Sequence, residues 1–165
     1  EATGAKAPTL YAEFVNKEGL FRAVLDRYIA RFAARHEALL FDEEKSVDRA
    51  LRDYFTAVAT CFTSKETPAG CFMINTSAAL AAASTDIANT VKSRHAMQEQ
   101  TLTQFLQQRQ LRGELPPDGD VRQLAQFLNC ILQGMSISAR EGADFTKIMQ
   151  IAETTLRLWP QVLQR

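Results

Sequence analysis

The sequence predicts an all-α protein, and three observations support that class. Apolar residues recur at steps of three and four along most of the 165 residues, which is the spacing of one face of a helix. The two clearest interruptions, KETPAG at 65–70 and PPDGD at 116–120, contain the prolines and glycines that end helices. No stretch alternates apolar and polar residues as a half-buried strand does. We therefore expect about seven helical segments.

The first long helix is expected to start at Asn16 and to end at about residues 39–40. The Asn16 side chain can accept a hydrogen bond from the free backbone N–H groups of the first turn. Apolar residues then follow at steps of four, three and four: Phe21, Leu25, Tyr28 and Phe32. Ser46 can cap a second helix in the same way, and that helix fills the residues before the KETPAG break.

Four further segments follow, each bounded by a capping residue, a glycine or a proline. They are 71–83, which is rich in alanine, then Thr85 or Asp86 to about Arg112, then Asp120 to near Gly142, and finally Phe145 to about Leu163.

Composition excludes several classes of protein. Hydrophobic residues make up 46% and charged residues 23%, as in a globular protein with a real core. The formal net charge is zero, so a nucleic-acid partner would have to be bound by locally placed charge. The three cysteines, Cys61, Cys71 and Cys130, form no CxxC pair and are expected to be free thiols in a reducing compartment. No run approaches the roughly 18 apolar residues of a membrane span, and no signal-peptide pattern opens the chain.

The opening stretch ATGAKAPTLYAEFVNKEGLF, at 2–21, reads as a turn, a very short helix, another turn and the start of a helix. A helix this short is not stable alone. The stretch resembles the second half of the helix-turn-helix of the TetR/AcrR family of bacterial transcriptional regulators. The matching residues are Gly4, Pro8-Thr9-Leu10-Tyr11, Phe14, Asn16-Lys17-Glu18 and Leu20-Phe21.

The resemblance implies a division of the chain. Residues 1–38 would be a partial helix-turn-helix domain with its linking helix, and 39–165 would be the effector-binding and dimerisation domain. The family's first helix and most of its second would precede this sequence, so we expect a truncated DNA-binding domain whose short helix needs those missing partners. The resemblance also implies that the protein acts in the bacterial cytoplasm.

The positions of the side chains on the short helix indicate which of them would contact DNA. Leu10 and Phe14 are four apart and share the face that anchors the helix. Lys6, Thr9 and Tyr11 would face the major groove, where an ammonium, a hydroxyl and a phenol suit phosphate and base-edge contacts.

Lys17 would sit at the start of the next helix, where its charge and the free backbone N–H groups make a phosphate site. Operator DNA is therefore the expected macromolecular partner.

A small-molecule effector is expected to bind between the 71–83 segment and the 86–112 helix, closed on another side by 46–65. The run of alanines, including Ala78 and Ala82, leaves volume beside the large side chains of the flanking helices. Four residues are candidate polar handles or reactive groups of this pocket: Cys71, Asn75, His95 and Gln98.

Taken singly, each of these polar residues also fits an ordinary satisfied core group. Cys71 follows Gly70 near a helix start, which would favour a thiolate and an electrophile or oxidant sensor, but a buried small hydrophobe is the plainer interpretation. Cys61 and Cys130 lie in apolar stripes and are expected to be structural.

The last two helices are expected to form a homodimer through 120–163. Each carries two apolar faces, which is more than a small monomer needs. The faces consist of Leu124, Phe127, Leu128, Ile131, Gly134, Met135 and Ser138 in one helix and Ile148, Ala152, Thr155, Leu156 and Trp159 in the other.

The function expected from these features is a dimeric repressor that releases operator DNA when a small molecule enters the helical domain. The alternative is an all-α small-molecule-binding or thiol-based sensor that does not bind DNA in this form. An enzyme is not expected, because His36 and His95 are the only histidines and no metal-ligand cluster or nucleophile–base pair is readable. No cofactor or metal is expected.

Overall fold

The computed structural model describes residue 4 and residues 7–75 and 84–163. Its regular elements, in chain order, are α1 Ala7–Phe14, α2 Lys17–Tyr28, η1 Ile29–Ala33, α3 Ala34–Leu40, α4 Val47–Phe62, α6 Thr85–Leu111, α7 Val121–Arg140 and α8 Phe145–Val162. All of these described elements are helical, so the predicted all-α class is confirmed. None of the described helices is long and apolar enough to cross a membrane.

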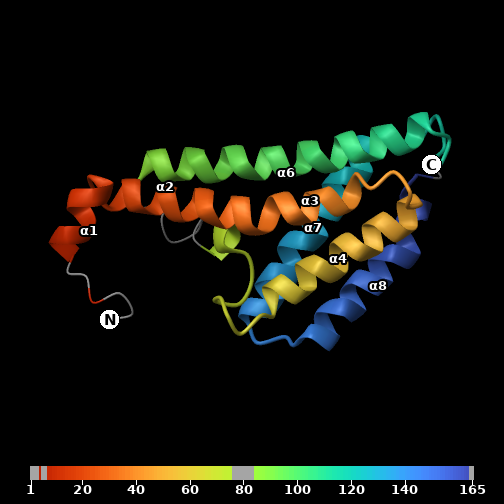
Figure 1. Ribbon diagram of the computed structural model, residues 1–165. Helices are drawn as coiled ribbons and strands as arrows, with labels where there is room; N and C mark the ends of the chain where they lie inside the picture. Colours follow the sequence, from red (N-terminus) through yellow and green to blue (C-terminus); the bar gives the residue numbers. More distant parts are fainter. Residues whose placement is uncertain (1–3, 5–6, 76–83, 164–165) are drawn as a thin grey trace.

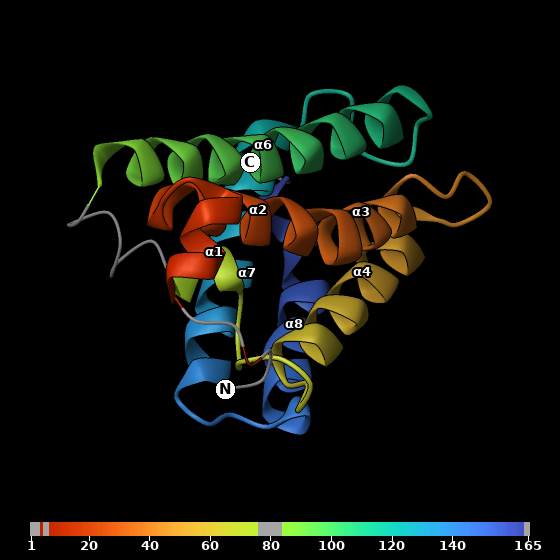
Figure 2. The same ribbon diagram turned by 60° about the vertical axis from the view of Figure 1, so that its left-hand side comes forward.

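Two long rods lie alongside each other, and three helices pack beneath them (Figures 1 and 2). One rod is α2, η1 and α3, and the other is α6. Helix α4 packs against α3, α7 and α8, while α7 also packs against α6. Helix α1 lies at the end of the first rod that is remote from α4 (Figure 1). The first rod therefore connects α1 to the body of the molecule.

Side-chain caps fix where the helices begin. The predicted caps Asn16 and Ser46 each accept a hydrogen bond from a backbone N–H three residues later, and so does Asp120, at the predicted start of its helix. Ser84 and Asp144 cap α6 and α8 in the same way. Each cap satisfies a backbone donor that the first turn leaves free.

The first rod contains a π-helical turn, η1, which the periodicity did not indicate. The Ala34 N–H donates to the Ile29 carbonyl, five residues back, so one wider turn interrupts an otherwise α-helical ladder. Such a turn changes the rotation per residue about the helix axis. The side chains after it therefore point in different directions from those of a regular α-helix. Tyr28, Ile29 and Phe32, at and beside this turn, all line the cavity described below.

The corner between α1 and α2 is tight. Val15 has a φ of 66°, a left-handed conformation that is costly for a β-branched residue. A Cβ added at Gly19 would lie 2.0 Å from the Phe14 carbonyl oxygen, so only glycine permits this close approach. The corner holds α1 at a defined angle to the first rod.

A buried arginine joins the other end of that rod to α6. Arg109 is 3% exposed and its guanidinium donates to the backbone carbonyls of Leu40, Asp42 and Lys45 at 2.6 to 3.2 Å. It also pairs with Glu114 at 2.9 Å. Burial alone would raise the pKa of Glu114, but the hydrogen bonds from Arg109 and the Val47 backbone hold it below its ordinary value. These contacts fix the loop after α3 onto the C-terminal end of α6.

Candidate effector cavity and DNA-binding end

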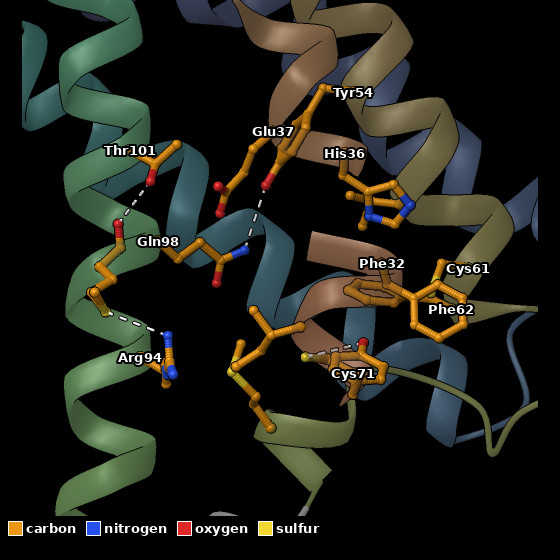
Figure 3. A pocket seen from close by; sticks show the side chains of 15 residues that line it. Phe32, His36, Glu37, Tyr54, Cys61, Phe62, Cys71, Arg94, Gln98 and Thr101 are labelled. Atoms are coloured by element: carbon orange, nitrogen blue, oxygen red, sulfur yellow. Dashed lines mark hydrogen bonds between the residues drawn. The ribbon is translucent and has the colours of Figure 1, made fainter. Parts of the chain in front are cut away.

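A cavity of about 210 Å³ lies between the first rod, α4, α6 and the residues around Cys71 (Figure 3). For scale, a cavity of about 150 Å³ lined by apolar side chains binds benzene. The space is therefore suited to a molecule of about one substituted ring.

Most of the cavity wall is apolar. The rings of Phe32 and Phe62 and the side chains of Val58, Met73 and Met97 contribute to it. They come from η1, α4, α6 and the segment after Gly70, so the wall depends on parts of the chain far apart in sequence. An occupant would contact all of these parts at once.

One end of the cavity is polar. The Gln98 side-chain amide donates to the Tyr54 hydroxyl at 3.5 Å. Figure 3 shows the Glu37 carboxyl group in the same region, and its charge acts on Tyr54. Burial raises the pKa of Tyr54 to about 12 and raises the pKa of Glu37 above its ordinary value. This end combines a carboxyl group, a phenol and an amide.

Two thiols lie toward the other end. The Tyr28 hydroxyl is 3.8 Å from the Cys71 Sγ, and Cys61 lines the same space. Burial raises the pKa of Cys61, which disfavours its thiolate. The Cys71 backbone N–H donates to the Ser136 hydroxyl at 2.7 Å, so this wall is attached to α7.

The structure distributes the four candidate effector residues unevenly. Cys71 and Gln98 line the cavity, whereas Asn75 and His95 are not among its lining residues. The Asn75 amide instead donates to the Ala69 carbonyl at 2.7 Å. Asn75 Oδ1 and His95 Nε2 are buried atoms without a hydrogen-bond partner in the described part of the chain. Burial lowers the pKa of His95.

The position of the cavity differs from the expected one in one wall. The 46–65 and 86–112 segments border it as expected, and Cys71 and Met73 represent the 71–83 segment. The first rod supplies a further wall through residues 28–37, on the N-terminal side of the expected domain boundary. The continuation of the Phe21-to-Phe32 stripe was the available sequence signal. Residues 76–83, with Ala78 and Ala82, lie outside the described residues.

Ion pairs connect α2 to the start of α6. Arg22 pairs with Asp86 at 2.6 Å, and Arg94 pairs with Asp26 at 3.3 Å. Arg94 also lines the cavity, so one residue touches both the cavity and the helix that leads to α1.

The end of the molecule that is expected to contact DNA presents part of the expected residue set. Thr9 on α1 is exposed, and Lys17 is exposed as the first residue of α2 beside the Asn16 cap. Tyr11 belongs to α1, and Lys6 lies outside the described residues.

Helices α7 and α8 bury one face and leave part of another uncovered. Leu124, Leu128 and Met135 of α7 are fully buried in the protein's own core. Ile137 is 49% exposed and Leu158 of α8 is 46% exposed.

A second stripe on α7 points outward. Phe127, Ile131 and Ser138 are half-buried. Gly134 is exposed, and a Cβ added there would meet nothing within 4 Å in the described part of the chain. Cys130, expected to be structural, is exposed beside this stripe.

A short helix at the end of a long rod, beside a helical body that borders a cavity, is the arrangement expected for an all-α transcriptional regulator. Residues 46–154 match the family model described as tetracyclin repressor-like, C-terminal domain. The chain is 75% identical over 164 residues to the HTH-type transcriptional repressor ComR of Escherichia coli K12, covering 99% of this chain and 78% of that one. It belongs to the TetR family of transcriptional regulators.

Solved structures agree with this assignment. The TetR family regulator CifR, in a cysteine mutant complexed with 26-base-pair operator DNA, has a TM-score of 0.83 and 26% identity, covering 94% of this chain and 81% of that chain. A putative TetR regulator from Rhodococcus sp. RHA1 has a TM-score of 0.65 and 26% identity, covering 98% of this chain and 84% of that chain. The expectation of a regulator rather than an enzyme agrees with these relatives.

Proposed function

We propose that this protein is a transcriptional repressor that binds operator DNA as a homodimer and releases it when a small molecule occupies the cavity. One observation carries the proposal. The first rod holds α1 at one end and supplies a wall of the cavity with residues 28–37. A ligand that favours a different rod position would also move α1.

DNA binding is assigned to Thr9, Tyr11 and Lys17, with Lys6 as a further contact. Repressors of this kind place their two recognition helices about 34 Å apart, in successive major grooves. A modest rotation of each rod would change that spacing, so the two recognition helices would no longer fit successive major grooves. The setting is the bacterial cytoplasm, as for a protein that acts on chromosomal operators.

Dimerisation is assigned to 120–163, with the outward stripe of α7 and the exposed apolar side chains of α8 as its centre. ComR and CifR are named as a repressor and as a regulator complexed with operator DNA, which supports the same role here.

The proposal is tested with the full-length protein. A thermal-shift screen of small molecules identifies ligands, and fluorescence anisotropy with labelled operator measures release. We expect at least one stabilising compound to lower operator affinity tenfold or more. The proposal fails if Val58→Phe, which fills the cavity, leaves both the stabilisation and the release unchanged.

A thiol-based sensor is the second candidate, because Cys61 and Cys71 line one cavity. In that case an alkylating agent would react at Cys71 and release operator, and Cys71→Ser would remove both effects. Reaction at the exposed Cys130 without loss of DNA binding would contradict it.

A further inference from the structure

The cavity contains a carboxyl group that is paired with no cation among the described residues. Glu37 lies on α3 and lines the polar end of the cavity, half-buried. The ion pairs of the described part of the chain do not include Glu37. Carboxylates removed from water are normally paired with a cation or hydrogen-bonded.

The opposite charge in the cavity wall is already engaged. The Arg94 guanidinium lies 3.3 Å from the Asp26 carboxylate, outside the polar end. Burial lowers the pKa of His36, the other basic side chain of the wall, and the nearby Arg35 lowers it further. Glu37 is thus the acidic side chain of the described cavity wall with which an occupant could pair.

Aromatic rings share the cavity wall with this carboxyl group. Tyr28, Phe32, Tyr54 and Phe62 all line the cavity. The faces of such rings carry partial negative charge and attract cations, quaternary ammonium groups in particular. The Tyr28 and Phe32 ring centroids lie 5.2 Å apart, so the two rings are neighbours in the wall. The Arg31 guanidinium lies 5.2 Å from the Phe32 centroid, so this ring already attracts one cation of the protein itself.

We propose that the cavity selects a small organic cation, a single-ring ammonium compound, held by the Glu37 carboxylate and the aromatic rings of the wall. The volume of about 210 Å³ limits the occupant to about that size. This inference rests on the proposed function, because it identifies the ligand class of the same effector cavity.

The experiment compares three probes of similar shape against the full-length protein by isothermal titration calorimetry. Phenyltrimethylammonium is the cation, tert-butylbenzene is its neutral isostere, and phenylacetate is the anion. We expect the cation to bind at least tenfold more tightly than either of the others.

The decisive variant is Glu37→Gln, which keeps the shape of the side chain and removes its charge. It should weaken cation binding at least tenfold and leave tert-butylbenzene binding unchanged. Glu99→Gln is the matched control, because Glu99 is also half-buried but does not line the cavity. Circular dichroism confirms that each variant is folded.

Each contrary outcome is distinct. If the neutral isostere binds as tightly as the cation, or if Glu37→Gln binds the cation as tightly as the unchanged protein, the ligand is not selected for positive charge. The cavity would still be the proposed effector site. Preference for phenylacetate overturns it in favour of recognition by Arg94. If no probe binds, the inference is wrong, and the proposed function is then judged separately by the Val58→Phe release experiment.

Discussion

The two sides of α4 differ in how they are packed. Leu51, Phe55 and Ala59 are completely buried and belong to the solid core. Tyr54, Val58 and Phe62, from the same helix, line a cavity instead. A filled core supplies stability, because every buried atom has close neighbours. The cavity side gives up some of those contacts and so leaves room for a ligand.

The largest expected effect compares one aromatic residue of the filled core, on α4, with one of the cavity wall, on η1. Phe55→Ala should cost about 3–5 kcal/mol of unfolding free energy, because it leaves a hole in a filled core. Phe32→Ala should cost only about 1–2 kcal/mol, since its ring is half-buried and already borders empty space. Urea denaturation measures both. Equal losses would mean that the cavity wall is packed as tightly as the core.

The outward and inward faces of α7 offer a similar contrast. Ile137→Glu should leave the protein folded but weaken the dimer by about 3 kcal/mol, because a charge would be buried unpaired between copies. Light scattering across a concentration series measures this. Leu111→Glu is the control, since Leu111 is 89% exposed at the end of α6. A dimer unaffected by Ile137→Glu would place the interface elsewhere.

Two arginines on α6 contact different parts of the first rod and its following loop. Arg109 holds the loop after α3, whereas Arg94 pairs with α2 and lines the cavity. Arg109→Ala should cost about 2–3 kcal/mol, because it leaves buried carbonyls without donors. Arg94→Ala should cost about 0–1 kcal/mol, since Arg94 is only half-buried and its partner Asp26 is exposed. Thermal unfolding of both variants tests the difference. A larger loss from Arg94→Ala would show that the cavity end is the more firmly held.

The smallest effect concerns Lys17, which is proposed to contact DNA. In the full-length protein, Lys17→Ala should weaken operator binding about fivefold at roughly 0.15 M salt, because one phosphate contact is lost. The slope of log affinity against log salt should fall by about 1. Lys65→Ala, which removes an exposed lysine from the loop after α4, should change neither quantity. An unchanged slope for Lys17→Ala would exclude a phosphate contact there.

Much of the fold could be predicted because its signals are local. Asn16 and Ser46 cap helices in the structure as predicted, and α7 begins directly after Asp120, where a helix start was predicted. The KETPAG and PPDGD breaks do separate helices. Caps, breaks and periodicity depend on residues within a few positions of each other, so the sequence alone reveals them.

The site could be predicted only in part. Cys71 and Gln98 do line the cavity, but residues 28–37 of the first rod were not expected to form one of its walls. The π turn at Ile29–Ala33 helps to decide which side chains face that space, and it had no sequence signature.

By itself, the sequence determined the helical class, most helix boundaries and the family resemblance of residues 2–21. Only the tertiary structure decided that Glu37, Tyr54 and Gln98 meet at one end of a cavity, and that Arg109 secures the loop after α3. The reason is physical. Helix formation follows from nearby residues, whereas a cavity exists only where side chains from distant helices fail to fill the space between them.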